Sequence, residues 1–248
     1  MAEEEKKAAE SEKNAEANAE KKPFLSENAV EVLVAIFLGI TALLTAWASW
    51  IGSLHGGNQA TNYTKSNNIA AEGNSEFNEG VQEYISDQMV WNTYNEYRYE
   101  LEIAEANGQD KTAELLVEKT ENYISENGSE ILQNAMDEMD KDPDKYYSPF
   151  DVPGVMDSYT TEALEKLDES QKLLEEGQRD NANGDAYNLV NVIYSVVLFL
   201  LGIVGVFKRL PNRKAVLFIA VIGLIATTVY MVTIPMPTGF SMSSFFKH

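Results

Sequence analysis

The sequence predicts an all-α membrane protein with three transmembrane helices and a helical extracytoplasmic domain continuous with spans one and two. Segments 32–54, 189–207 and 215–234 are almost free of charged residues, and each is close to the roughly 20 residues that a helix needs to cross a bilayer. Between the first two segments, apolar residues recur at helical spacing and strand-like alternation is absent. The mean hydropathy of −0.27 therefore averages over very unlike segments.

The N-terminal segment 1–31 is predicted to be a disordered cytoplasmic tail, because 1–22 holds no apolar residue beyond alanine and Met1. Transmembrane helix 1 follows at 32–54, with Trp47 and Trp50 expected at the outer interface. A cleavable signal peptide is the alternative, since Ala46-Trp47-Ala48 has a small-x-small pattern. An uncleaved span fits better, because 31 mostly polar residues precede 23 apolar ones.

Residues 55–185 are predicted to form an acidic helical extracytoplasmic domain. They hold thirty acidic and nine basic side chains, a net charge of −21. Helical spacing of apolar residues occurs over 81–94 and again over 113–131, with Asn107-Gly108 as a turn between them. Capping residues at 157–162 predict the start of a third helix, which continues without a break into transmembrane helix 2 at 189–207. Three prolines within 140–154 predict a loop before it.

The short connector 208–214 predicts the orientation of the chain. It carries four basic and no acidic residues, and a Lys/Arg bias in short loops marks the cytoplasmic side. A basic cytoplasmic loop at 208–214 places the N-terminus in the cytoplasm. Transmembrane helix 3 at 215–234 then leads to an extracytoplasmic tail at 235–248. The expected location is the plasma membrane, with a multi-pass topology.

Small and polar residues form one face on each of the first two spans, which predicts helix–helix packing. In span one, the spacings of 4, 3, 4, 3 and 4 place six of them on a single face. These six residues are Ala35, Gly39, Ala42, Ala46, Ser49 and Ser53. The corresponding face of span two holds Asn188, Asn191, Ser195, Gly202 and Gly205.

Three interpretations of these faces stay open. They can pack the spans within one chain, they can join copies of the chain in a homo-oligomer, or they can line a water-filled pore. The register of the first face continues beyond the span through mostly small and polar residues as far as Val81 and Ile85. This mostly small and polar register favours close packing inside a bundle over a strongly apolar coiled coil.

A calcium loop is a further alternative for the acidic segment after residue 139. Asp140, Asp142, Asp144 and Asp151 stand at positions 1, 3, 5 and 12, as the carboxylates of an EF-hand loop do. Lys145 occupies the position that needs glycine, and Asp151 replaces the usual bidentate glutamate. A solvated acidic loop without any cofactor is therefore the preferred interpretation.

The composition argues against an enzyme and against nucleic acid as a partner. Cysteine is absent, and the only histidines are His55, beside a membrane end, and the terminal His248. The chain has no phosphate-binding glycine motif and no HExxH motif. The net charge of −21 over 55–185 is unfavourable for binding phosphates. Aromatic residues around Trp91 and Tyr94 are predicted to pack in a core, with a ligand or partner surface as the alternative.

Several short motifs resemble a group of uncharacterised bacterial membrane proteins with one N-terminal span, a helical outer segment and two C-terminal spans. The motifs lie within about 46–205 and are Ala46-Trp47, Gly56-Gly57-Asn58-Gln59-Ala60, Ser148-Pro149-Phe150, Val152-Pro153, Gly184-Asp185-Ala186-Tyr187-Asn188-Leu189 and Val197-Leu198-Phe199. The resemblance implies a bacterial inner membrane and supplies no catalytic residues. That group has a proline-rich stretch at the position of Asp140–Asp144, which argues against general calcium binding.

The function expected from these observations is that of a non-enzymatic integral membrane protein that assembles through its transmembrane and outer helices. The partners are the lipid bilayer and either further copies of the chain or another subunit of a membrane complex. The alternative function is an oligomeric cation channel in which the acidic outer domain forms a vestibule, since clefts of one charge sign concentrate counter-ions.

Overall fold

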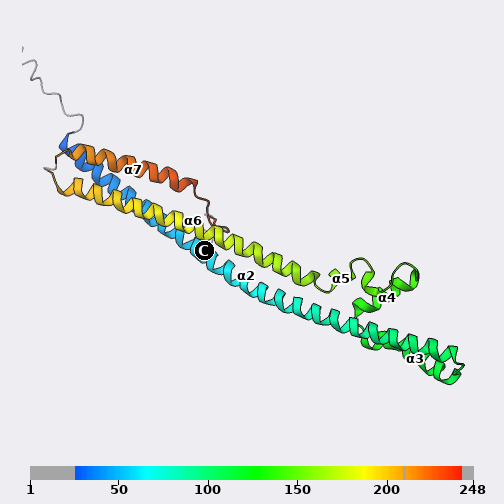
Figure 1. The fold of residues 1–248 in the computed structure, drawn as a ribbon. Helices are drawn as coiled ribbons and strands as arrows, with labels where there is room; N and C mark the ends of the chain where they lie inside the picture. Colours follow the sequence, from blue (N-terminus) through cyan, green and yellow to red (C-terminus); the bar gives the residue numbers. More distant parts are fainter. Residues whose placement is uncertain (1–25, 209–210, 242–248) are drawn as a thin grey trace, which may run out of the picture. The chain divides into compact units, whose positions relative to one another are not determined.

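A computed structural model of the chain describes residues 26–208 and 211–241, which form helices joined by short loops (Figure 1). The elements in order are α2 (Glu27–Ala106), α3 (Asp110–Asn127), α4 (Glu130–Lys141), η1 (Pro149–Asp151), α5 (Val155–Ser158), α6 (Thr161–Val206) and α7 (Arg213–Thr233). These described residues contain no strand, so the predicted all-α class is confirmed.

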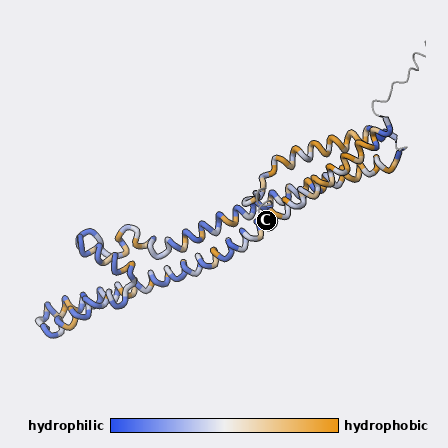
Figure 2. The backbone as a smooth tube through the Cα atoms, turned by 180° about the vertical axis from the view of Figure 1, so that it is seen from behind, coloured by the Kyte–Doolittle hydropathy of each residue, from blue (hydrophilic) through white to orange (hydrophobic). Residues whose placement is uncertain are grey.

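Three of the helices, α2, α6 and α7, are long and apolar enough to cross a membrane, which indicates a membrane protein as predicted. In Figure 2 the apolar segments appear in orange over part of α2, the end of α6 and α7. Both α2 and α6 also extend far beyond their apolar segments, so the predicted continuation of spans one and two into further helix is confirmed.

The beginning of α2 lies inside the segment predicted to be a disordered tail. Ser26 accepts a hydrogen bond from the backbone N–H of Ala29 through its hydroxyl (3.2 Å), and its carbonyl accepts one from Val30 (3.1 Å). Helix therefore starts at Glu27, because a serine cap satisfies the first free N–H groups. The rest of the predicted tail, residues 209–210 of the basic loop and residues 242–248 lie outside the described residues.

The chain divides into two compact units, each built from part of α2 and part of α6. The first unit holds α7 and the described residues up to 57 and from 180 onward; the second holds residues 58–179. The second unit is close in extent to the predicted outer domain 55–185.

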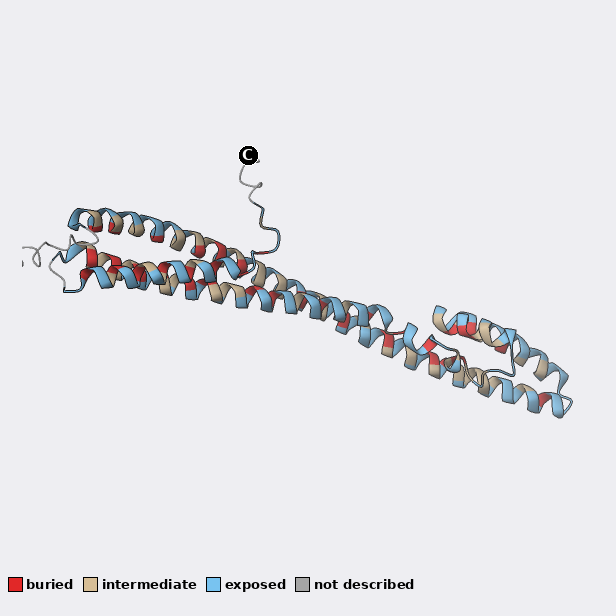
Figure 3. Ribbon diagram, turned by 90° about the horizontal axis from the view of Figure 1, so that it is seen from above, coloured by how far each residue is buried: buried red, intermediate tan, exposed pale blue. Residues whose placement is uncertain are grey.

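Helices α2, α6 and α7 of the first unit pack through residues that recur at intervals of three and four. Their buried side chains form one apolar cluster, visible as the red faces in Figure 3. On α6 these residues are Tyr187, Val190, Tyr194, Val197, Leu201 and Val204; on α7 they are Leu217, Ala220, Leu224 and Met231, with the buried Thr227 at the same spacing and Ile234 directly after the helix. This seven-residue repeat is typical of helices that cross at a small angle and interlock their side chains.

Polar contacts fasten one end of this three-helix bundle. The buried Arg213, first residue of α7, donates to the carbonyl of Val204 (2.8 Å) and to the Glu27 carboxylate (2.6 Å). Lys208 pairs with Glu31 at 2.8 Å. These contacts connect the beginning of α2 with the end of α6 and the start of α7.

Aromatic contacts fasten the C-terminal segment to α2 in the same unit. Phe240 packs edge-on against Trp47 and Trp50, with ring centroids 6.2 and 5.7 Å apart, and the two indoles lie 5.3 Å from each other. The two tryptophans predicted to mark an interface therefore also hold the chain that follows α7.

In the second unit, α2 and α6 approach closely at small residues. Ser66 and Ser170 are both buried, and each hydroxyl donates to the other residue's carbonyl at 2.9 Å. Gly80 lies against the backbone of Tyr159, since a Cβ placed on it would fall 1.8 Å from the Tyr159 carbonyl oxygen. Position 80 therefore requires glycine because no side chain fits there, and not because of an unusual backbone conformation.

The buried Asp87 of α2 joins three segments of the second unit. Its Oδ1 accepts from the backbone N–H of Ser129 at 2.9 Å, and its Oδ2 accepts from the hydroxyls of Ser129 and, at 2.7 Å, Tyr159. Ser129 caps α4, and Tyr159 directly follows α5. Burial, together with the hydrogen bond to Asp87, raises the pKa of Tyr159 well above its usual value, so the phenol remains a donor.

The helical stretch predicted over 113–131 is two helices in the structure. The break lies at Gly128 and Ser129, where α3 ends and the Ser129 hydroxyl accepts from the N–H of Leu132 (3.2 Å) to begin α4. Apolar spacing continues across this break, so periodicity alone did not reveal the serine cap. The turn predicted at Asn107-Gly108 is confirmed, with Gly108 at a positive φ of 64°.

Gly80→Ala is expected to destabilise the protein by about 3 kcal/mol, because the added methyl group meets a backbone oxygen that cannot move aside cheaply. The measurement is thermal unfolding in detergent followed by circular dichroism. Gly56→Ala is the matched control in the same helix, because a Cβ there meets no atom within 4 Å. Equal melting temperatures for both variants would contradict the close approach at Gly80.

Candidate functional site

The six small residues predicted as the packing face of span one are all exposed in the chain. Ala35, Gly39 and Ala42 are uncovered, and so are Ala46, Ser49 and Ser53. A Cβ added to Gly39 would meet nothing within 4 Å. Within the described residues this face does not pack against the other spans of the same chain, which argues against the first of the three open interpretations.

The reason is that α2 uses a different face inside the bundle. Its buried residues in the first unit are Val30, Val34, Thr41, Ala48, Ile51 and His55. With Val34 at position a of a seven-residue repeat, all six of these residues fall at positions a and d. The six small residues then occupy positions b and f, which lie on the opposite side of the helix. The buried residues lie in the bundle, and the six small residues form a separate exposed face.

The predicted face of α6 behaves differently. Asn188 and Ser195 are exposed, whereas Asn191, Gly202 and Gly205 are half-buried at the border of the bundle. A Cβ on Gly205 would lie 3.4 Å from Val34 Cγ1, so this glycine does border α2. The buried Oδ1 atom of Asn191 has no hydrogen-bond partner among the described residues. Only part of this face contributes to packing within the chain.

The interior of the three-helix bundle is filled by side chains. Tyr187, Tyr194, Ile51 and Leu201 are among the largest fully buried residues of the described chain. These side chains belong to the apolar cluster shared by α2, α6 and α7.

A buried ion pair that sequence reasoning missed lies at the far end of this bundle. His55 is 1% exposed, and its Nδ1 lies 2.7 Å from Oδ1 of Asp180, which is 6% exposed. Its Nε2 lies 3.1 Å from the carbonyl oxygen of Pro235. Tyr187 stacks on the imidazole at 5.8 Å between ring centroids. One side chain thus bridges α2, α6 and the segment that follows α7.

Both ring nitrogens of His55 face oxygen acceptors. Nδ1 lies against the carboxylate of Asp180, and Nε2 lies against the backbone carbonyl of Pro235. No solvent-facing nitrogen is left for acid–base work on a substrate. The signal available in the sequence was the interval of seven from Thr41 to Ala48 and from Ala48 to His55, which places the histidine on the buried face of α2.

The four aspartates of the predicted calcium loop lie on different local structures. Asp140 is in α4, Asp142 ends that helix, and Asp151 is in η1, where its carboxylate accepts from the N–H of Ser148 at 3.0 Å. Nowhere in the described residues do three or more histidine or acidic side chains gather in a way that could hold a metal ion. Capping of η1 is therefore the role that the structure gives Asp151.

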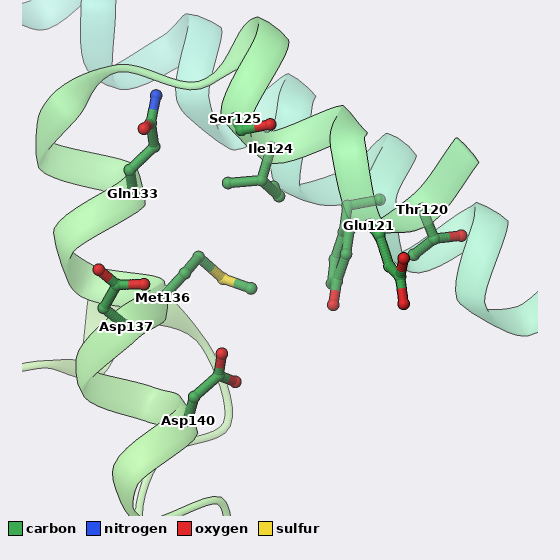
Figure 4. Close-up of a pocket in the computed structure, with 9 residues that line it drawn as sticks. Thr120, Glu121, Ile124, Ser125, Gln133, Met136, Asp137 and Asp140 are labelled. Atoms are coloured by element: carbon green, nitrogen blue, oxygen red, sulfur yellow. The ribbon is translucent and has the colours of Figure 1, made fainter. Parts of the chain in front are cut away.

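An acidic pocket of about 360 Å³ lies among α2, α3 and α4 in the second unit (Figure 4). Its apolar side is formed by Ile124 and Met136, and its polar side carries Glu121, Asp137 and Asp140. Tyr94 from the predicted aromatic cluster also lines it. Trp91 stacks on Tyr94 at 5.5 Å, and Arg98 lies 5.9 Å from the same ring, so this cluster both packs and borders the pocket.

Comparisons of the chain with protein-family models, with curated proteins and with solved structures find no match. The resemblance to bacterial three-span membrane proteins therefore stays a prediction, and every functional argument rests on the chain's own geometry.

Asp180→Ala is expected to lower the free energy of unfolding by about 3 kcal/mol, because it leaves the buried His55 without its charge partner. In a protein of this size, such a loss lowers the melting temperature by roughly 6–12 °C. Asp185→Ala is the control, since Asp185 is an exposed carboxylate on the same helix and in the same unit.

A double-mutant cycle measures the interaction energy between His55 and Asp180 separately from the effect of each single substitution. His55→Ala combined with Asp180→Ala should cost clearly less than the sum of the two single variants. Strict additivity would show that the two side chains do not interact in solution.

Proposed function

We propose that the protein is a non-enzymatic integral membrane protein that assembles with further copies of itself, or with another membrane subunit, through α2. The observation that carries this proposal is the exposed face formed by Ala35, Gly39, Ala42, Ala46, Ser49 and Ser53. This face lies on the side of α2 opposite to its buried residues, so the chain's own spans leave it available.

A face of small residues can promote association between helices in a bilayer. Lipid tails are as apolar as leucine, so helices associate in a bilayer through close packing and hydrogen bonds rather than through the hydrophobic effect. Small residues on one face let two backbones approach closely, and the serine hydroxyls can bond across the contact. A partner helix gains these contacts, whereas lipid chains do not reproduce their geometry.

The same register continues along α2 in the second unit. Ala60, Thr64, Asn67 and Ala71 are exposed there, and the apolar Ile85 and Met89 further along are 50% and 66% exposed. The outer part of α2 is therefore included in the proposed assembly beside its membrane-spanning part.

The location that fits this function is a plasma membrane, with the beginning of α2 in the cytoplasm and the second unit outside. The support is the basic connector, whose Lys208, Arg213 and Lys214 lie at the same bundle end as Glu27. Short basic loops stay on the cytoplasmic side. The motif resemblance to bacterial proteins favours a bacterial inner membrane.

Gly39→Leu is expected to weaken assembly, because a branched side chain holds the two backbones apart. The protein concentration needed for half of the chains to assemble should rise at least about tenfold. Mass measurement of single particles in mild detergent gives the distribution of species. Ile40→Leu is the matched control, since the neighbouring Ile40 is exposed but points to another side of the helix. A wild-type protein that is strictly monomeric and purifies without partners would overturn the proposal.

Cysteine labelling tests the orientation, and the absence of native cysteines makes it clean. Tyr147→Cys should react with a membrane-impermeant maleimide in intact cells whose outer barrier is permeabilised, because Tyr147 is 98% exposed in the second unit. Ser244→Cys should react as well, whereas Ser11→Cys should react only after lysis. The reverse pattern would place the second unit in the cytoplasm.

A further inference from the structure

The segment that follows α7, residues 234–241, contains no helix or strand and lies against the rest of the first unit. Its Phe240 belongs to the residues packed on the apolar cluster and contacts both Trp47 and Trp50 through its ring. A segment without helical or sheet hydrogen bonds depends on side-chain contacts of this kind for its position. Loss of one such contact therefore affects how firmly the whole segment is bound.

One contact of this segment depends on the protonation of His55. Its Nε2 atom lies 3.1 Å from the carbonyl oxygen of Pro235, and its Nδ1 atom lies 2.7 Å from Oδ1 of Asp180. The carbonyl oxygen is an acceptor only, so Nε2 must donate for the first contact to be a hydrogen bond. The second contact also needs one proton, which either the ring or the carboxyl group can carry. In both cases the His55–Asp180 pair must hold two protons to make both bonds.

The surroundings of the imidazole offer little compensation for a lost proton. His55 is 1% exposed and Asp180 is 6% exposed. Besides Asp180, the titratable group that faces the ring from α6 is the fully buried Tyr187, which stacks on it. On α2 itself, the other residues of 51–59 are uncharged. A lone pair turned toward the Pro235 carbonyl would therefore oppose another lone pair in a buried position, which is unfavourable.

Removal of one proton from the pair weakens one contact more than the other. A charged carboxylate binds an N–H more strongly than a neutral carbonyl does, so the remaining proton stays between His55 and Asp180. Nε2 then presents its lone pair to Pro235, and the hydrogen bond to the segment is lost.

We propose that the His55–Asp180 pair is a pH-sensitive switch for the segment 234–241. With two protons, the pair holds the segment on the bundle. When pH rises and one proton passes to solvent, the segment is released, and Trp47 and Trp50 lose the cover of Phe240.

Fluorescence quenching tests this switch on the full chain in detergent. Trp91→Phe makes Trp47 and Trp50 the only indoles, and acrylamide quenching is measured from about pH 5 to about pH 9, the range around the ordinary histidine titration. We expect quenching to rise with pH in a step that corresponds to one proton. The equilibrium between released and bound segment should shift at least about tenfold, because a buried acceptor loses its donor.

Two variants in the same background serve as controls. His55→Gln has no titrating ring, so its quenching should show no step. Phe240→Ala should give high quenching at every pH, because it removes the ring that contacts both indoles.

NMR of isotope-labelled histidine provides a readout that does not depend on a variant of His55. His55 and His248 are the only histidines, so His248→Asn leaves a single set of ring signals. These signals should titrate at the same pH as the fluorescence step. A ring that keeps one protonation state over the whole range, a ring that titrates without a change in quenching, or a step that persists in His55→Gln would each overturn the proposal. These outcomes do not depend on whether the chain assembles with itself.

Discussion

The division of α2 into a buried face and a free face determines the rest of the first unit. Val34, Thr41, Ala48 and His55 recur at intervals of seven, and each is buried; Val34 and Ala48 belong to the apolar cluster shared with α6 and α7. Only the a and d positions of α2 can face its two neighbouring helices at the same time. The small residues at positions b and f therefore lie outside the buried face. In water, an excluded apolar face would be covered by folding. In a bilayer, lipid solvates it at little cost, and it stays available for another helix.

Three of the buried polar side chains each connect three segments of the described chain. His55 bridges α2, α6 and the segment after α7, Arg213 bridges the ends of all three membrane helices, and Asp87 bridges α2, α4 and the residue after α5. Burying a polar or charged group is unfavourable unless hydrogen bonds compensate it. His55 and Asp87 meet that condition with partners distant in sequence, whereas Arg213 meets it through Nε and Nη1 and keeps a buried Nη2 without a partner among the described residues.

The sequence was sufficient for the helices and insufficient for the contacts between them. Runs of uncharged residues and the turn at Asn107-Gly108 predicted spans and boundaries, because these features act locally. The break at Ser129 was missed because apolar spacing continues across it, and the bonds from Ser129 to Asp87, 42 residues away, cannot be read from local pattern. For the candidate site, small residues were correctly found on one face of α2. Which face the chain buries depends on how Val34 and Ile51 match side chains of α6 and α7, and periodicity within one helix does not contain that information.

The position of Asp87 has a consequence for how the second unit opens. Helices α4 and α5 are short, 12 and 4 residues, and helices of this length are marginal in water without tertiary contacts. The Asp87 carboxylate accepts hydrogen bonds from Ser129, the N-cap of α4, and from Tyr159, the residue after α5. Loss of these bonds therefore frees both helices at once. Amide hydrogens from Glu130 to Tyr159 should therefore exchange with a common opening free energy, as one cooperative block, while those of α2 beside them exchange through rarer, larger openings.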